Sequence, residues 1–299
     1  MEYYVGHIVE GKSFNIFGIS YIGAPRSNTA MFITKKVENL LSTLESVDEC
    51  LVFAETGINV SEKLAEKHAF HFSEKPQLAY ARFANEFADE RFEKEKKLKY
   101  NLMPGGYYVS EDVVIPDDAY IEPGCIVGPD VQIGMNAKLL ANSVIRRSTI
   151  GDNFIANEQS VVGAYGFTMA EDDEGNKVRI PTLGRVIIGN QVEVGSQNNV
   201  SCGSGGDTIL EDNVKLDSLV YLGHDVHLHK SVEVTAGVAV GGFVEVGEGA
   251  YIGVGSVIRN RILIGEHSFI GMGANVTKSV EAGVVVAGNP AKPFISFGS

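Results

Sequence analysis

Three histidines stand close together in the segment GHDVHLH, as His224, His227 and His229. An imidazole has an ordinary pKa of about 6.5, so at neutral pH it can take a proton from an attacking nucleophile and act as a general base. The same side chains could instead bind a metal ion, or be solvated surface groups. Asp217 and Asp225 accompany them, and either carboxylate could orient a substrate hydroxyl or an imidazole, or only form a turn.

An aliphatic side chain occupies every sixth position around these histidines. A helix repeats every 3.6 residues and a strand every 2, so a sustained period of six indicates the hexapeptide repeat of a parallel β-helix. Three hexads form one triangular turn, so residue n lies above residue n−18, about 4.8 Å away. The unbroken row consists of Leu210, Leu216, Leu222, Leu228, Val234, Val240, Val246, Ile252, Ile258, Ile264, Ile270 and Val276.

The period reaches beyond this row, from about Val109 to Val280, and predicts roughly eight or nine turns of coil. It slips by one residue at Ile150. Two polar, glycine-rich segments, residues 164–184 and 201–208, interrupt it and are predicted to leave the coil as loops. Loops that leave a solenoid commonly carry its function.

The residues before the coil alternate between strand-like and helix-like patterns, which predicts a small α/β domain. We therefore predict an α/β domain over residues 1–105, a parallel β-helix over 106–285 and a C-terminal tail over 286–299. The predicted strands are ISYIG (19–23), AMFIT (30–34), ECLVFAE (49–55) and AFHFS (69–73), and the predicted helices are 37–46, 61–69 with Ser61 as a possible cap, and 76–98 opened by Pro76.

The composition excludes several classes of function. A net charge of −13 over 299 residues argues against nucleic acid or an anionic membrane as the main partner. No stretch of about 18 apolar residues is present to span a membrane. The first residues lack the basic and apolar regions of a signal peptide, and the three cysteines are widely spaced, so we expect a cytoplasmic protein.

Long segments resemble the UDP-3-O-acylglucosamine N-acyltransferase of lipid A synthesis. They are VVGAYGFTMAEDDEGNKVRIPTLGRVIIGNQVEVGS, DSLVYLGHDVHL, AGVAVGGFVEVG, PRSNTAMFITKK and KPQLAYARFANEF. The resemblance implies a left-handed β-helix and a homotrimer with sites between subunits. It places His224 on the catalytic histidine, with Asp225 and Asp217 as possible support. Gly242 lies one coil above His224, and a backbone N–H there or at Gly241 could stabilise an oxyanion.

The resemblance also implies a nucleotide-linked sugar as the acceptor. Tyr165 and Phe167 in the first loop are candidate substrate-binding residues, as is Phe32, which matches the first of two aromatic residues that sandwich uracil in the family. The second should fall near Val37 or Glu38, which are not aromatic. We therefore expect a different base or a different mode of base binding.

The segments IGEHSFIGMGANV and GNPAKPF resemble instead the coenzyme A-dependent acyltransferases of nucleotide-linked amino sugars. The chain stops soon after GNPAKPF, where the lipid A enzyme continues with helices that help dock acyl carrier protein. The resemblance implies that pantetheine lies along the late turns. The candidate contacts are Gly241, Gly255, Gly273, Ala274 and Lys278.

We expect N-acylation of a dTDP- or UDP-linked amino-deoxy sugar for a surface polysaccharide, with acyl-coenzyme A as co-substrate and no permanently bound cofactor. The alternative is the lipid A enzyme itself, with a hydroxyacyl group from acyl carrier protein. A structural or ice-binding coil would show outward rows of Thr, and the outward positions here are mixed.

A metal site is not expected. The γ-class carbonic anhydrases, which are also β-helices, bind zinc with histidines from neighbouring coils. A site of that kind would need a histidine near position 206 or 242, where this chain has Gly206 and Gly242. His227 and His229 flank one inward residue, so we expect their side chains to diverge rather than to meet at one tetrahedral ion.

Overall fold

The computed structural model describes residues 2–293, which divide into two compact units. The first unit contains the residues up to Lys96, together with Phe167–Leu183 and Ser204–Gly206. The second unit contains Lys97–Gly166, Gly184–Gly203 and the chain from Asp207 onward. The division at Lys96 precedes the boundary predicted near residue 105, because β7 (Tyr100–Leu102) pairs antiparallel with β8 (Tyr108–Ser110), the first strand of the coil.

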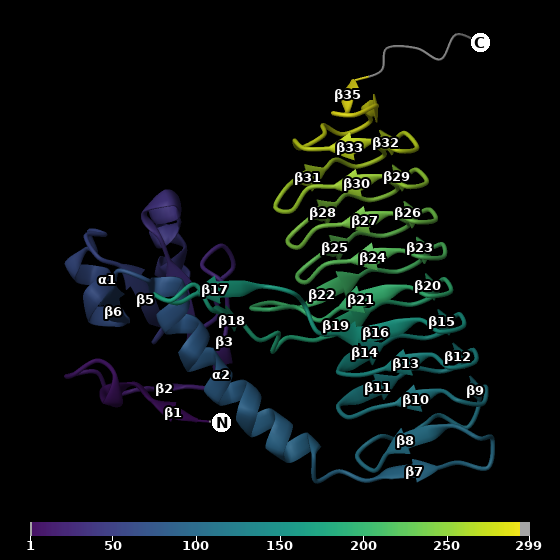
Figure 1. Cartoon of the computed structure of the whole chain (residues 1–299), viewed down its shortest axis with the longest axis horizontal. Coiled ribbons are helices and arrows are strands. Elements are labelled where there is room, and N and C mark those ends of the chain that lie inside the picture. Colours follow the sequence, from purple (N-terminus) through teal and green to yellow (C-terminus); the bar gives the residue numbers. More distant parts are fainter. Residues whose placement is uncertain (1, 294–299) are drawn as a thin grey trace. The chain divides into compact units, whose positions relative to one another are not determined.

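The second unit is a parallel β-helix, whose strands stack into three sheets within the described residues (Figure 1). Sheet I contains β7 and β8, then β10 (Ile126–Val127), β13 (Val144–Ile145), β16 (Val161–Ala164), β21 (Asn199–Ser201), β24 (Tyr221–Leu222), β27 (Ala239–Val240), β30 (Val257–Ile258) and β33 (Asn275–Val276). Sheet II contains β11 (Val131–Ile133), β14 (Ser148–Ile150), β19 (Val186–Ile188), β22 (Thr208–Leu210), β25 (His227–Leu228), β28 (Glu245–Val246) and β31 (Leu263–Ile264). Sheet III contains β9 (Tyr120–Ile121), β12 (Lys138–Leu139), β15 (Ile155–Ala156), β20 (Glu193–Val194), β23 (Lys215–Leu216), β26 (Glu233–Val234), β29 (Tyr251–Ile252), β32 (Phe269–Ile270), β34 (Val285–Ala287) and β35 (Lys292–Pro293).

The predicted row of aliphatic side chains fills the interior of this coil. Each of its twelve members is at most 3% exposed. Strand register keeps the row aligned, since Leu222 pairs with Val240 and Leu228 with Val246 in the next coil. Removal of these side chains from water stabilises the stack, at about 25 cal/mol per Å² of apolar area.

The slip at Ile150 reflects a shortened corner. Ile133 pairs with Ile150, and only residues 146 and 147 join β13 to β14, whereas residues 128–130 join β10 to β11. One residue fewer in the corner shifts the numbering without moving the inward side chain.

The end of the coil also differs from the prediction. β34 pairs in parallel with β32 and antiparallel with β35, so the stack continues into the predicted tail. The rest of that tail, residues 294–299, lies outside the described residues.

The first segment that interrupts the coil, residues 164–184, contains a hairpin that belongs to the α/β unit. β17 (Met169–Glu171) pairs antiparallel with β18 (Lys177–Arg179). Ala170 and Ile180 pack in the same apolar cluster as Leu78 and Phe87 of α2 (Pro76–Glu95). The loop predicted from its polar, glycine-rich composition thus contributes two apolar side chains to the core of the α/β unit.

The α/β unit is built on a parallel sheet with the strand order β3-β4-β5-β6. These strands are β3 (Gly18–Ile19), β4 (Thr29–Ile33), β5 (Leu51–Glu55) and β6 (Ala69–Ser73), and a separate pair joins β1 (Tyr3–Tyr4) to β2 (Asn15–Ile16). α2 packs on β4 and β5, with Pro76 in its first turn. α1 (Glu62–Lys67) begins after Ser61, whose hydroxyl accepts a hydrogen bond from Leu64 N–H at 3.4 Å.

Two local predictions for this unit differ from the structure. The segment predicted as a helix over 37–46 is helical, but as the 3-10 helix η2 (Lys35–Ser46), interrupted by non-helical backbone at Val37, whose β-branched side chain disfavours helix. A second 3-10 helix is η1 (Val5–His7). The strand predicted over 19–23 ends at Ile19, because the following residues form a tight bridge between Tyr21 and Ala24.

The described cysteines are free thiols and are buried. None of the described helices is both long enough and apolar enough to cross a membrane.

Candidate functional site

His224 lies at the corner that leads from sheet I to sheet II. β24 ends at Leu222 and β25 begins at His227, so residues 223–226 form the corner. Asp225 has a φ of +57°, in the left-handed region that Asp tolerates better than most residues because its short side chain can hydrogen-bond locally. Val226 is fully buried and anchors the corner in the core.

The imidazole of His224 pairs with the neighbouring carboxylate. His224 Nδ1 lies 2.8 Å from Asp225 Oδ2, and the two side chains are 12% and 3% exposed. The Asp225 backbone N–H donates to Thr208 Oγ1 at 2.9 Å, which fixes the corner to the coil below. A carboxylate only accepts hydrogen bonds, so in a neutral imidazole Nδ1 would carry the proton and Nε2 would be the acceptor atom.

The other edge of this ring faces Gly242 in the next coil. A Cβ placed on Gly242 would lie 2.9 Å from both Nε2 and Cε1 of His224. Only glycine therefore leaves the imidazole in place. The ring also packs edge-on against Phe243, with centroids 5.0 Å apart, and Arg261 lies over the Phe243 ring at 4.1 Å.

The two glycines proposed for an oxyanion differ in what their N–H groups do. Gly241 N–H donates to Ile258 O at 2.9 Å as part of the coil ladder, so its prediction as an oxyanion donor was wrong. Gly242 N–H makes no backbone–backbone hydrogen bond within the described residues. A Cβ on Gly223 would lie 2.6 Å from Gly242 N, so glycine at position 223 keeps the space beside that nitrogen open.

The residues predicted to bind coenzyme A do not share one edge of the coil. Gly255 and Gly273 lie at the corner from sheet III to sheet I, and exposed Lys278 follows β33 at the corner that also carries His224. Ala274 is fully buried, so its prediction as a groove residue was wrong. Its side chain points inward because the fourth position after an inward aliphatic, here Ile270, is also a core position.

Asp217 lies at a different corner from His224. It follows β23 of sheet III, and its Oδ1 accepts a hydrogen bond from Ser218 N–H at 2.7 Å. This hydrogen bond is a local turn contact, which is one of the roles that the sequence leaves open for Asp217.

The three aromatic candidates lie in different surroundings. Phe32 is half-buried in the α/β unit, with its ring centroid 5.2 Å from that of Tyr80. Tyr165 is exposed in the coil unit, and its hydroxyl accepts a hydrogen bond from Arg147 at 3.1 Å. Phe167 is exposed on the loop, with the Arg179 guanidinium 5.4 Å from its ring centroid.

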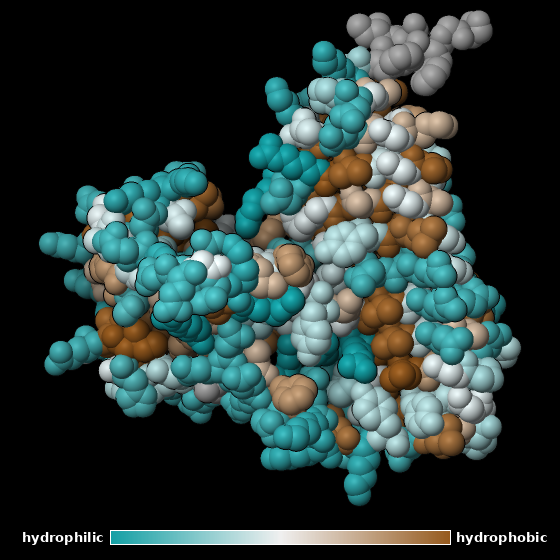
Figure 2. All heavy atoms as spheres, viewed as in Figure 1, coloured by the Kyte–Doolittle hydropathy of each residue, from teal (hydrophilic) through white to brown (hydrophobic). Residues whose placement is uncertain are grey.

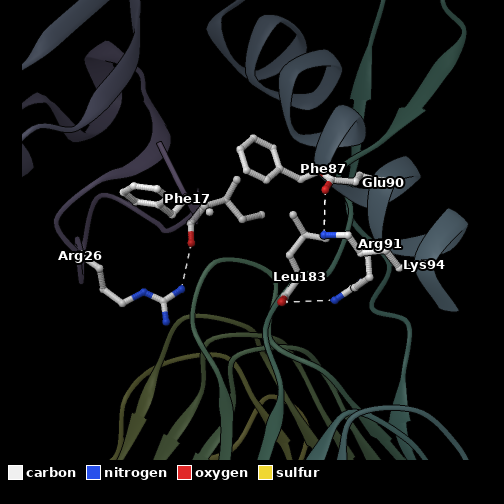
Figure 3. A pocket seen from close by; sticks show the side chains of 9 residues that line it. Phe17, Arg26, Phe87, Glu90, Arg91, Lys94 and Leu183 are labelled. Atoms are coloured by element: carbon white, nitrogen blue, oxygen red, sulfur yellow. Dashed lines mark hydrogen bonds and ion pairs between the residues drawn. The ribbon is translucent and has the colours of Figure 1, made fainter. Parts of the chain in front are cut away.

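A hollow of about 370 Å³ in the α/β unit was not predicted from the sequence (Figure 3). Arg26 donates to the carbonyls of Ile19 and Gly205, and Arg91 donates to those of Thr182 and Leu183, so both guanidiniums bind backbone oxygens. The lining comes from four separate segments, which no local motif connects. It consists of Phe17, Gly18, Ile19, Arg26, Phe87, Glu90, Arg91, Lys94 and Leu183.

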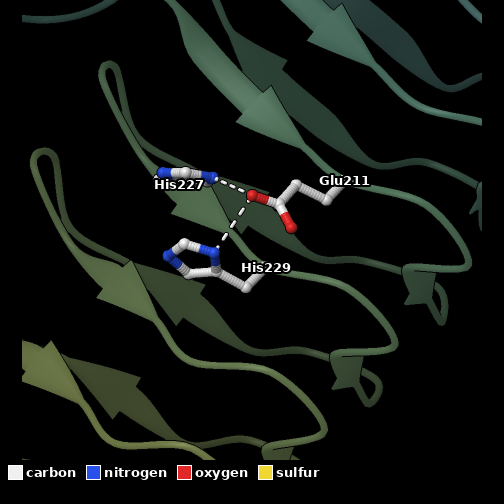
Figure 4. A group of neighbouring side chains, drawn as sticks. All are labelled: Glu211, His227 and His229. Atoms are coloured by element: carbon white, nitrogen blue, oxygen red, sulfur yellow. Dashed lines mark hydrogen bonds and ion pairs between the residues drawn. The ribbon is translucent and has the colours of Figure 1, made fainter.

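The expectation that His227 and His229 diverge was wrong. Both project from sheet II, their rings stack with centroids 4.0 Å apart, and both contact Glu211 (Figure 4). Partial burial alone would raise the pKa of the Glu211 carboxyl, but the hydrogen bond from His227 and the charges of His229 and His227 lower it overall. The signal in the sequence was the 18-residue coil repeat, which places Glu211 beside His229.

Comparison with known proteins supports the prediction that the coil is built from hexapeptide repeats. Residues 112–147 match the family described as bacterial transferase hexapeptide (six repeats). The UDP-3-O-acylglucosamine N-acyltransferase of Hydrogenovibrio crunogenus is 38% identical over 112 residues, which are 37% of this chain and 32% of that protein. The corresponding enzyme of Cupriavidus pinatubonensis is 27% identical over 175 residues, 51% of this chain and 47% of that protein. The chain thus matches about a third to a half of the length of these relatives.

Two solved structures share the fold. LpxA from Acinetobacter baumannii superposes with a TM-score of 0.58 at 25% identity, over 65% of this chain and 74% of that one. The UDP-N-acetylglucosamine acyltransferase from Campylobacter jejuni gives a TM-score of 0.57 at 20% identity over the same shares. These findings confirm the predicted left-handed parallel β-helix. Part of the coil thus matches the hexapeptide-repeat family, and part of the chain is similar to UDP-3-O-acylglucosamine N-acyltransferases.

Proposed function

We propose that this chain is an N-acyltransferase that acts on a nucleotide-linked amino sugar. The observation that carries the proposal is the arrangement of His224, whose Nδ1 is held by Asp225 while its other edge faces Gly242. The names of the relatives support the acceptor of the alternative prediction, UDP-3-O-acylglucosamine, better than the amino-deoxy sugar predicted first. We therefore take UDP-3-O-acylglucosamine as the acceptor.

In the proposed reaction the acceptor amine attacks the carbonyl carbon of an acyl thioester, and His224 Nε2 takes a proton from the amine. The new C–N bond forms as the carbonyl π electrons move onto oxygen. The Gly242 N–H donates a hydrogen bond to this oxyanion. The intermediate then collapses, the C–S bond breaks, and the leaving thiolate takes the proton from the imidazolium. Asp225 keeps the ring oriented and stabilises its charged form.

The proposed reaction requires only that the donor is an acyl thioester, and it does not by itself say which molecule carries the acyl group. Acyl carrier proteins are strongly acidic, and a chain with a net charge of −13 repels them at long range unless a basic patch offsets the repulsion. We therefore propose that acyl-coenzyme A serves as a donor.

The test is transfer to UDP-3-O-acylglucosamine and to a dTDP-linked 4-amino-deoxyhexose, with one hydroxyacyl group presented on coenzyme A and on acyl carrier protein. Product formation is followed by mass spectrometry. We expect N-acylation of UDP-3-O-acylglucosamine, with a higher kcat/KM for the coenzyme A thioester. Transfer only to the amino-deoxyhexose would restore the acceptor predicted first, and no transfer to either sugar would refute the proposed function. A higher kcat/KM for acyl carrier protein would refute the donor assignment alone.

A further inference from the structure

A column of acidic and histidine side chains runs up the outer face of sheet II. In the parallel register Ile209 pairs with His227, and His227 pairs with Glu245. Glu211 follows β22 in the coil below, and His229 follows β25 directly above it. All of these residues alternate with inward-facing aliphatics, so their side chains leave the same face.

Three donor atoms in this column converge on one point (Figure 4). Glu211 Oε1 lies 2.8 Å from His227 Nε2 and 3.0 Å from His229 Nδ1. One ligand atom from each residue can be chosen so that all three lie within 4.8 Å of one another. Ligand atoms that each lie about 2.0–2.2 Å from one tetrahedral ion are separated from one another by distances close to those between these three donor atoms. Little movement of the side chains is therefore needed to bind an ion.

Further contacts orient two of these donors. Glu211 Oε2 accepts a hydrogen bond from the Lys230 backbone N–H at 3.0 Å, which leaves Oε1 directed at the histidines. His229 Nε2 lies 2.9 Å from Glu245 Oε1. When Nε2–H donates to that carboxylate, the Nδ1 lone pair points at Glu211 and is available to an ion. A carboxylate on the far nitrogen of a histidine is the usual support of a metal-binding imidazole.

The cluster is reachable from solution. The side chains of Glu211, His227 and His229 are 37%, 31% and 30% exposed. Glu211 also lines a hollow of about 350 Å³ on the same sheet, together with Ile187, Ile209, Asp212 and Lys230. Three protein ligands leave a fourth tetrahedral position for water or another small ligand.

We propose that Glu211, His227 and His229 bind one divalent transition-metal ion, of which Zn²⁺ is the best fit to two imidazoles and a carboxylate. The site belongs to the face of sheet II, whereas His224 lies at the preceding corner. It goes beyond the proposed acyl transfer and does not depend on it.

The test is metal binding by the full chain after treatment with a chelator, measured by calorimetry with Zn²⁺ and by visible absorption with Co²⁺. We expect one equivalent per chain. His227→Gln and His229→Gln lower the affinity by about 100-fold or more, and Glu245→Gln, which removes only the supporting carboxylate, lowers it by about tenfold.

His267→Asn is the matched control. This exposed histidine sits at another corner of the coil with a φ of +53°, a conformation that Asn also adopts readily, so the variant keeps the Zn²⁺ affinity of the wild type. Circular dichroism checks that each variant is folded, and Glu211→Gln replaces any histidine variant that is not. The proposal is overturned if the wild type shows no saturable binding, or if its affinity equals that of the folded ligand variants.

Discussion

Asp225 has two structural roles: its backbone forms the turn at the corner, and its carboxylate contacts the imidazole of His224. Its left-handed φ indicates a turn residue, which is one of the roles that the sequence leaves open for Asp225. Its carboxylate nevertheless lies 2.8 Å from His224 Nδ1 and is almost completely buried. The sequence could not separate the two roles because the same short acidic side chain suits both. The pairing is visible only when the direction of the side chain is known.

Another histidine, His68, is buried in the α/β unit. Its Nδ1 accepts a hydrogen bond from Cys50 N–H at 3.1 Å, and its Nε2 lies 3.1 Å from Leu44 O. Burial lowers the pKa of His68, because the charged ring loses water. The unfolded chain then binds a proton at a pH where the folded chain does not, so the free energy of unfolding falls as the pH drops below about 6.5.

We predict that His68→Asn removes this contribution. The free energy of unfolding of the wild type should fall more steeply than that of the variant, by up to about 1.4 kcal/mol per pH unit below about pH 6.5. Urea unfolding followed by the helical circular dichroism signal reports mainly on the α/β unit, which carries α2. His267→Asn, on an exposed histidine, should keep the wild-type slope. Equal slopes for the wild type and His68→Asn would show that the buried ring does not govern this pH dependence.

At the scale of elements, the strict hexad predicted the coil well, because the same six-residue spacing sets both the core and the register. It could not predict which N–H groups the ladder uses, so Gly241 and Gly242 looked equivalent. It also missed the convergence of His227 and His229, which depends on side-chain torsions. In the α/β unit, short strands and a 3-10 helix obey no long period, so their ends were less predictable.

The contact between neighbouring coils at Gly242 gives an element-scale prediction. Gly242→Ala places a Cβ 2.9 Å from Nε2 and Cε1 of His224 and must displace the ring. We expect kcat to fall by about 10²-fold with a smaller change in KM, because a misplaced base costs rate more than binding. The melting temperature of the variant, measured in parallel, separates this effect from unfolding. Full activity in a folded Gly242→Ala protein would mean that the position of the imidazole is not important.

At the scale of the whole molecule, the coil leaves apolar side chains exposed on sheet I and the corner before it. Leu219, Tyr221, Val254, Val257 and Met272 are each at least 40% exposed. Figure 2 shows apolar side chains at the surface of the coil among polar ones. Clustered exposed apolar residues indicate a protein interface, and closed cyclic assemblies are favoured.

We predict that the chain forms a homotrimer through this apolar edge. Light scattering should give three times the chain mass of 32.2 kDa. Val254→Lys with Met272→Lys, which places charge on the edge without touching the core, should shift the mass toward that of one chain. A wild-type mass of one chain at the concentrations used for catalysis would contradict the prediction.

The central claim is that His224 is the base of an acyl transfer to a nucleotide-linked amino sugar. The most direct test is kcat for N-acylation of UDP-3-O-acylglucosamine by the wild type, His224→Asn and the control His267→Asn, each checked for folding and assembly. The account predicts a fall in kcat of about 10² or more for His224→Asn and wild-type turnover for His267→Asn. Wild-type turnover by a folded His224→Asn protein would contradict it.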